Sequence, residues 1–232
     1  MRDVDIYSAA DEAIKTMNRD ILRDFGKLKL AKFDELHIIR DVNDLYRRQA
    51  LKARKRYYEV SFEACLLGFY LCGKSGREAQ KLADDIITQE WIEGLLDEPD
   101  LVTQYSFTRE TERKAQRLIE ALTAEAEKAA GTGRVSPENV QTSGKDALID
   151  KAIREWSKQV GQYALNVTDA AIMEAYEKAG IEKGMWDTEK DQRVCTTCHA
   201  LDGMIFLLSE VPAKPHWGCR CRILPVRETA EG

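Results

Sequence analysis

Apolar residues recur with a helical period in the first half of the chain. In the stretch 41–60 they follow one another at spacings of three, four and seven residues: Val42, Leu45, Tyr46, Ala53, Tyr57 and Val60. Such spacings place side chains on one face of a helix. The pattern therefore predicts a long amphipathic helix whose apolar stripe is buried.

Two further helices are predicted between this stretch and residue 130. Ser75 and Glu78 have the spacing of a capping box, which predicts a helix from there to about Leu96, just before Pro99. A segment rich in Ala, Glu, Lys and Arg predicts another helix over 108–130, ended by glycines. The first 130 residues are thus expected to form a body of long helices.

The pattern changes after residue 130. Glycines, a proline and small polar residues over 131–144 predict a linker between a helical body, 1–130, and a second domain, 145–232. A lead-in helix is expected over 146–180, and short β-prone pieces at 204–208 and 223–226 lie among prolines, glycines and cysteines. The fold class expected is mainly α, with a long-helix body followed by a small α+β C-terminal domain.

Composition narrows the class of protein. The 232 residues are 44% hydrophobic and 32% charged, as in ordinary globular proteins, and no run of about 20 apolar residues exists to span a bilayer. The acidic start of the chain does not match a signal peptide, so we expect synthesis in the cytoplasm and no membrane partner. The net charge of −5 argues against wholesale wrapping by nucleic acid.

The six cysteines fall into two groups. Cys65 and Cys72 lie in an apolar helical run and are expected to be buried structural residues. The other four cysteines cluster near the C-terminus with one histidine, in the order Cys195, Cys198, His216, Cys219 and Cys221. A C-x-x-C turn aims two sulfurs at one point, and a second turn can complete a tetrahedron of zinc ligands. The spacing predicts zinc bound by Cys195, Cys198, His216 and either Cys219 or Cys221.

The predicted zinc is structural rather than catalytic. An extended backbone would aim Cys219 and Cys221 to opposite sides, so only one of them is expected to complete the site. A catalytic zinc leaves one position for water, whereas this cluster offers more soft ligands than a tetrahedron needs. The short segment around the cluster contains few strands and buries little surface. It therefore also needs such a cross-link in order to fold.

The order of unusual residues around the cluster resembles a known family. Trp186, Thr188, Asp191 and Val194 precede the first cysteine pair, and Leu201, Gly203, Pro212 and Pro215 stand between it and His216. In this order and spacing, the segment resembles the Mu F-like head-morphogenesis family of tailed phages. The likeness extends over about 100–226. The family often has Arg-Thr-Glu in the lead-in helix, whereas this chain has Val167-Thr168-Asp169.

The resemblance implies a minor capsid protein inside the virion head. Its expected partners are the portal protein and other capsid components, and its expected role is to support head assembly or DNA packaging and ejection. It implies no enzymatic activity and no small-molecule substrate. It also favours Cys219 as the fourth ligand, with Cys221 as the alternative.

A basic strip on the predicted 41–60 helix is a candidate for weak, non-specific DNA contact. Its members are Arg47, Arg48, Lys52, Arg54, Lys55 and Arg56. Cations spaced in this way can meet phosphates, although such a run is more often a solvated helix face. The alternative function is therefore a metal-stabilised DNA-binding module, while a hydrolytic or redox enzyme lacks a supporting motif.

Overall fold

The computed structural model describes residues 5–28, 34–98, 106–131, 143–190, 192 and 194–227. Seven α-helices and one three-stranded sheet lie in these ranges, so the expected mainly α fold with a small C-terminal α+β part is confirmed. The helices are α1 Ser8–Phe25, α2 Glu35–Leu71, α3 Gly76–Ile86, α4 Gln89–Asp97, α5 Phe107–Gly131, α6 Ser143–Lys178 and α7 Thr196–Leu201. The strands are β1 Lys183–Asp187, β2 Ile205–Leu207 and β3 Arg222–Val226, with the 3-10 helix η1 at Leu208–Glu210.

The chain packs into two compact units, each made of segments distant in sequence. The bundle unit comprises the described parts of 14–55 and 96–160, and the sheet unit comprises those of 1–13, 56–95 and 161–232. Helices α2 and α6 contribute residues to both units. Most of the predicted linker 131–144 lies outside the described residues, and the division of the chain at this linker stays a prediction.

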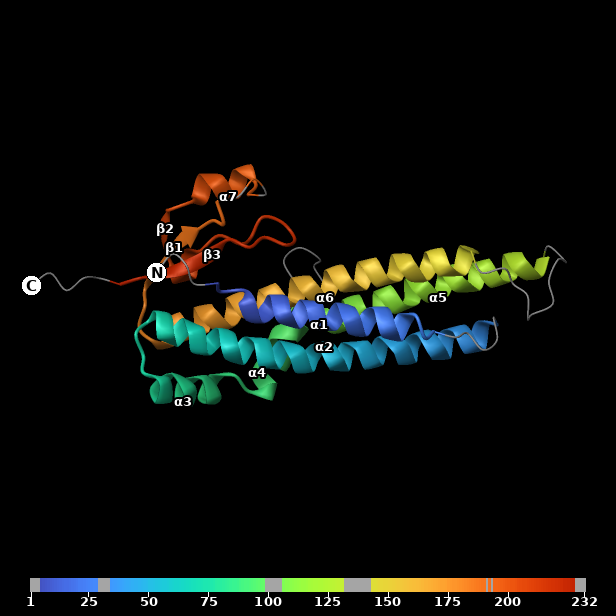
Figure 1. Ribbon diagram of the computed structural model, residues 1–232, viewed down its shortest axis with the longest axis horizontal. Helices are drawn as coiled ribbons and strands as arrows, with labels where there is room; N and C mark the ends of the chain where they lie inside the picture. The colour runs from blue at the N-terminus through green and yellow to red at the C-terminus, as the bar shows by residue number, and fades with distance from the viewer. Residues whose placement is uncertain are drawn as a thin grey trace, which may run out of the picture. The chain divides into compact units, whose positions relative to one another are not determined.

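The bundle unit is held together by a chain of aromatic rings. Four helices, α1, α2, α5 and α6, run side by side there (Figure 1). Phe25 packs edge-on against Tyr46 with ring centroids 5.5 Å apart, and Tyr46 packs in the same way against Trp156 at 5.2 Å. Phe107 packs against Trp156 as well, with ring centroids 5.9 Å apart. One aromatic side chain from each helix thus joins a continuous core, and such pairs add to the free energy of burial.

The apolar stripe predicted on 41–60 is confirmed as the buried face of α2. All six of its residues have exposed fractions of 3% or less: Val42, Leu45, Tyr46, Ala53, Tyr57 and Val60. The helix is longer than the stripe, because the apolar run through Cys65 continues it to Leu71. Cys65 is buried as expected, while Cys72 is half-buried just beyond the helix end.

The helix predicted from Ser75 to about Leu96 is interrupted. Ser75 caps α3 as expected, since its side chain accepts a hydrogen bond from Glu78 N, but α3 ends at Ile86 and α4 begins at Gln89. The hydroxyl oxygen of Thr88 accepts from Trp91 N at 3.1 Å, which provides α4 with its own N-cap. Ile87 between the two helices is 1% exposed, so the break turns this side chain into the core.

The sheet is antiparallel, with the strand order β2-β1-β3. The β-prone pieces predicted at 204–208 and 223–226 correspond to β2 and β3, whereas the central strand β1 was not predicted. The sequence of β1, Lys-Gly-Met-Trp-Asp, lacks the run of β-branched residues typical of a strand. Gly184 in β1 is required by packing, because a Cβ there would lie 2.3 Å from Ile223 Cγ2.

Close packing of α2 on α6 within the sheet unit predicts opposite effects for two glycine substitutions. A Cβ at Gly68 would lie 2.7 Å from the Cβ of Ala175, whereas one at Gly94 in α4 would meet nothing within 4 Å. Gly68→Ala should lower the free energy of unfolding by about 1–3 kcal/mol through overpacking. Gly94→Ala should raise it by about 0.5–1 kcal/mol, because alanine favours helix. Urea unfolding measures both, and a stabilising Gly68→Ala would contradict the close approach.

Candidate metal centre

The first cysteine pair is positioned by the start of α7. Cys195 is the N-cap residue, with extended backbone angles (φ −73°, ψ 161°), and its sulfur accepts a hydrogen bond from Cys198 N at 3.4 Å. A capping side chain folds back over the first helical turn, which brings the Cys195 sulfur toward Cys198. Cys198 is 1% exposed, whereas Cys195 is half-buried. The C-x-x-C turn therefore has one inner and one outer sulfur.

The loop between η1 and β3 supplies the other three candidate ligands. This metal loop, residues 211–221, contains His216, Cys219 and Cys221. Cys219 N donates to His216 O at 3.3 Å, and Gly218 inside this turn has φ +71°, a conformation that glycine adopts without strain. The turn returns the chain toward α7 before β3 begins.

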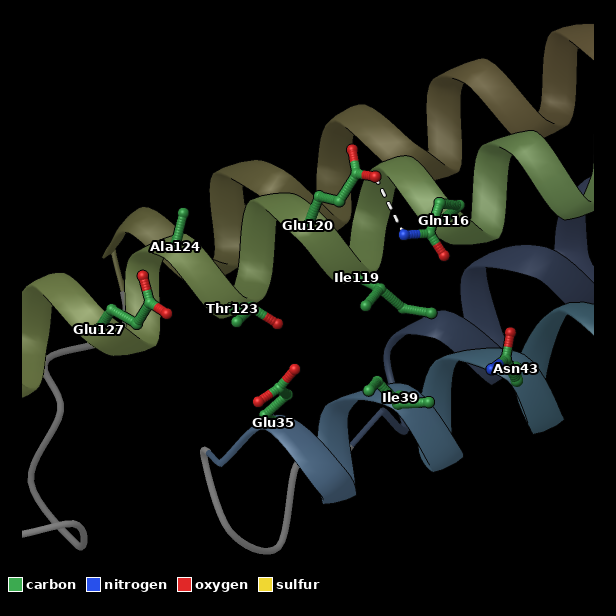
Figure 2. A pocket seen from close by; sticks show the side chains of 9 residues that line it. All are labelled: Glu35, Ile39, Asn43, Gln116, Ile119, Glu120, Thr123, Ala124 and Glu127. Carbon is green, nitrogen blue, oxygen red and sulfur yellow. Dashed lines mark hydrogen bonds between the residues drawn. The ribbon is translucent and has the colours of Figure 1, made fainter.

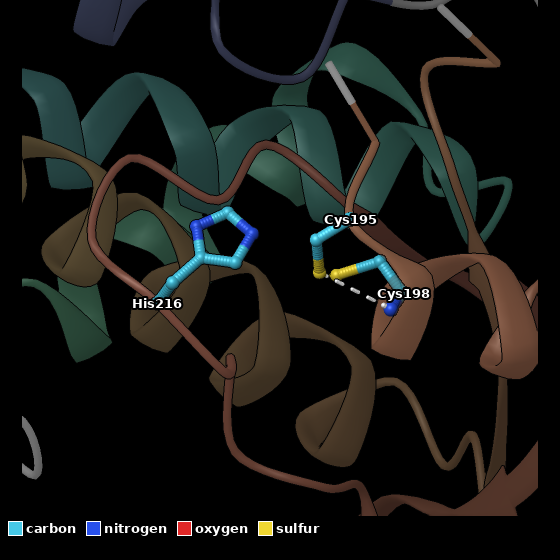
Figure 3. Close-up of side chains that lie close together, drawn as sticks. All are labelled: Cys195, Cys198 and His216. Atoms are coloured by element: carbon cyan, nitrogen blue, oxygen red, sulfur yellow. Dashed lines mark hydrogen bonds between the residues drawn. The ribbon is translucent and has the colours of Figure 1, made fainter. Parts of the chain in front are cut away.

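The five side chains form two groups of three that share Cys198. The ligand atoms of Cys195, Cys198 and His216 lie within 4.8 Å of one another, and so do the sulfurs of Cys198, Cys219 and Cys221. Figure 3 shows the first group, with the imidazole on the metal loop turned toward the two sulfurs at the start of α7. The sulfurs of Cys198 and Cys219 are 3.5 Å apart. The residues singled out from the sequence thus lie together, and their role as ligands stays a prediction.

Cys219 and Cys221 do not point to opposite sides, as an extended backbone would require. Both sulfurs belong to the group around Cys198, and both side chains are buried. Residues 219–221 lie outside β3, in an irregular segment that directly follows the turn at Gly218. The alternation of side chains applies only to regular strands. The expected divergence of these two side chains was therefore wrong, whereas which of them completes the site stays a prediction.

Burial and hydrogen bonding separate the thiols in their pKa values. The Cys198 backbone N–H holds the pKa of the Cys195 thiol down to about 7, with a further contribution from His216. Burial raises the pKa of the Cys198 thiol. Burial also raises the pKa of the Cys221 thiol, to about 11, while the Trp186 indole N–H acts to lower it. Without a cation the Cys198 and Cys221 thiols are therefore protonated at neutral pH. A bound metal ion would favour their thiolate form.

His216 has one ring nitrogen free to bind a metal. Its Nδ1 lies 3.0 Å from the Trp217 carbonyl oxygen, which can only accept, so Nδ1 carries the proton. This hydrogen bond raises the pKa of His216. The neutral ring then presents the lone pair of Nε2, an arrangement common among histidine ligands whose other nitrogen is hydrogen-bonded.

The surroundings of the cluster are apolar on one side and open on the other. Trp186 is 1% exposed and packs with the three inner cysteines, and five more apolar side chains surround them: Val194, Leu201, Phe206, Val211 and Ile223. A cavity of about 250 Å³ borders the sulfurs and His216, with Glu189 and Arg220 at its lining. An ion therefore has both a dry inner wall and a route from solvent.

The basic strip is largely engaged within the protein. Arg47 pairs with Asp44 at 3.1 Å, Lys52 with Asp24, and Arg56 with Glu59 at 2.6 Å. Arg54 donates to Thr108 Oγ1 at 2.7 Å, and its guanidinium lies over the Phe107 ring. Within the described residues, only Arg48 and Lys55 of the six make no such contact, and both are exposed. The strip is thus not a continuous row of unpaired cations, which weakens the case for DNA contact.

A second cavity, of about 360 Å³, lies between α2 and α5 in the bundle unit (Figure 2). Its lining includes three carboxylates, Glu35, Glu120 and Glu127, together with Ile39 and Ile119. Gln116 donates to Glu120 Oε1 at 3.0 Å. Carboxylates repel phosphate groups, so this cavity offers no site for an anionic ligand such as a nucleotide.

The fold and the cluster define a class of protein: long packed helices joined to a small sheet whose core contains a group of cysteines and a histidine. The sequence profile of the family described as Phage Mu protein F like protein matches residues 104–224, just over half of the chain and all five clustered side chains. The chain belongs to this family of structural phage proteins. It accordingly has a role in head morphogenesis as a minor capsid protein of the virion, with other capsid components as partners.

No curated protein and no solved structure matches the chain significantly. None of the described helices combines the length and the hydropathy that crossing a membrane requires. The functional assignment therefore rests on the family match and on the geometry of the cluster.

The different environments of the thiols predict their order of reaction with iodoacetamide in the metal-free protein. The thiolate is the nucleophile, so labelling of Cys195 should rise with pH around a midpoint near 7. Burial raises the pKa of the Cys65 thiol to about 12 and also raises that of Cys198, so both thiols should react much more slowly than Cys195. Peptide mass spectrometry across pH 5–9 measures each rate. Cys195 labelling with a midpoint near the ordinary thiol value would contradict the hydrogen bond from Cys198 N.

Proposed function

We propose that this protein associates with the portal inside the procapsid and supports head assembly or DNA packaging and ejection. The observation that carries this proposal is the family match over 104–224, which includes α5, α6, α7 and the cysteine–histidine cluster. Long packed helices and a small sheet with a potential metal cross-link suit a structural component that is present in few copies. The alternative of a metal-stabilised DNA-binding module receives little support, because most of its expected contact strip is paired within the protein.

We also infer that the cluster binds one structural zinc ion. Soft sulfur donors with one imidazole are the ligands that structural zinc takes, in tetrahedral geometry. Five donors lie in two overlapping groups, so four positions can be filled by protein and none is left for a reacting water. The ligand set proposed is Cys195, Cys198, His216 and Cys219, with Cys221 as the alternative fourth ligand.

Trp186 supports the alternative role of Cys221. The Nε1 of this buried indole has no hydrogen-bond partner among the described residues, and its N–H acts to lower the pKa of the neighbouring Cys221 thiol. An unpaired buried donor costs about 1–3 kcal/mol, and a thiolate held by zinc is an acceptor that removes this cost. The residues around the cluster, and not only the four proposed ligands, therefore fit a bound zinc ion.

Loss of the shared cysteine should abolish metal binding. We expect about one zinc per wild-type chain purified without chelator, and less than a tenth of that for Cys198→Ser, because Cys198 belongs to both groups. Cys72→Ser, which removes a free thiol outside the cluster, is the matched control and should keep its zinc. Inductively coupled plasma mass spectrometry gives the ratio. Wild-type protein with little zinc and freely titrating thiols would refute the metal centre.

Portal association can be tested by co-expression with the portal protein encoded by the same phage genome. The wild-type chain should elute with the portal oligomer in size-exclusion chromatography, and it should do so at salt concentrations that abolish binding to DNA. The Arg48→Gln, Lys55→Gln double variant serves as a control, because it removes the two unpaired cations of the strip. Elution with DNA rather than portal, lost in this double variant, would favour the alternative function.

A further inference from the structure

The N-terminal segment of the chain packs against the metal loop. Tyr7 precedes α1 directly and is 1% exposed, a degree of burial that tyrosine reaches less often than aliphatic residues do. Its hydroxyl lies 2.6 Å from Asp169 Oδ1 on α6 and 3.0 Å from the carbonyl oxygen of Cys221. Tyr7 thus touches the backbone of a candidate ligand, although it lies outside the residues that the family profile matches.

Lys214 fixes the direction of the hydrogen bonds at Tyr7. Its ammonium group donates to the Tyr7 hydroxyl and pairs with Asp169 Oδ2 at 2.6 Å. It also donates to the Cys219 carbonyl oxygen at 3.4 Å. An ammonium group can only donate, so the tyrosine oxygen accepts from Lys214 and its single proton goes to Asp169 or to the Cys221 carbonyl. These contacts link the Cys221 backbone to α6 through Tyr7, and the Cys219 backbone to α6 through Lys214.

Arg220, between the two loop cysteines, is held by the same segment. Its guanidinium pairs with Asp11 of α1 at 2.8 Å and lies 5.8 Å from the centre of the Tyr7 ring. Lys214 lies over the ring as well, at 4.7 Å. Cations near an aromatic face are attracted by its quadrupole. The ring of Tyr7 therefore attracts two cations of the metal loop in addition to the hydrogen bonds of its hydroxyl.

We propose that Tyr7 is a positioning residue of the metal centre, holding the metal loop so that the sulfurs of Cys219 and Cys221 meet Cys198. The proposal rests on the zinc binding proposed above. The Cys219 carbonyl accepts a hydrogen bond from Lys214, and the Cys221 carbonyl oxygen lies 3.0 Å from the Tyr7 hydroxyl. The position of each carbonyl constrains where the adjoining side chain points. A separate anchor, Gly218 N donating to Gln162 Oε1 at 2.7 Å, holds the loop to α6 without Tyr7. Loss of the hydroxyl should accordingly loosen the loop and leave the fold intact.

The test compares zinc affinity in three single variants and one double variant of the full chain. Tyr7→Phe removes the hydroxyl and keeps the ring, Asp169→Asn removes the charge that orders Lys214, and Tyr58→Phe is the matched control on an exposed tyrosine. Competition with a chromophoric zinc chelator gives each dissociation constant. Contacts that orient metal ligands are worth about 10–100-fold in affinity, so Tyr7→Phe should weaken zinc binding about tenfold or more. The double variant of Tyr7 and Asp169 should be less than additive, because both act in one network.

Amide hydrogen exchange of 214–221 in the zinc-free protein separates positioning from general stability and from metal binding. Faster exchange in this loop alone, with the rest of the sheet unit unchanged in Tyr7→Phe, supports the proposal. Zinc affinity within twofold of wild type, in a wild-type protein that does bind zinc, overturns it. A wild-type protein that binds no zinc refutes the proposed metal centre. Amide exchange in the loop then decides whether Tyr7 positions it. Equal loop exchange in the wild type and in Tyr7→Phe would overturn the positioning role as well.

Discussion

The small sheet and α7 depend on the contacts made by the three inner cysteines. Two strands of five residues, one of three and a six-residue helix bury little apolar surface by themselves, and the buried group at their centre consists of Trp186, Cys198, Cys219 and Cys221. Thiols pack as small apolar side chains, yet three of them around one point contribute less packing than larger side chains would. A metal ion at this point would replace weak sulfur contacts with strong bonds and connect α7 to the chain leading into β3.

The rest of the sheet unit places the two turns that contain these cysteines. The turn at Cys195 follows from local helix capping, whereas the metal loop is held by side chains from α1 and α6. Asp169 occupies the last position of the Val167-Thr168-Asp169 stretch in α6, and it pairs with Lys214. The acid in this stretch thus has a defined contact in this chain. Val167 is fully buried, which leaves no place for a charged side chain at its position.

The bundle unit is held together by packed aromatic side chains rather than by a group of cysteines. Its aromatic rings interlock across four helices, and several of its cations, such as Arg47 and Lys52, are paired with carboxylates on the surface. Exposed ion pairs of this kind contribute little to stability but reduce the local positive potential. This arrangement favours contact with protein over contact with DNA, in agreement with a structural role in the phage head.

The sequence by itself determined the helices with strong apolar periodicity, the positions of β2 and β3, and the five side chains of the cluster, because periodicity and ligand spacing are local properties. It could not indicate the break at Ile87, which depends on burial in the core, or β1, whose residues become a strand only between two partners. The tertiary structure alone decided that Cys219 and Cys221 face the same way and that Tyr7 reaches the metal loop. Both depend on contacts between segments up to 214 residues apart, and no local pattern in a single sequence encodes such contacts.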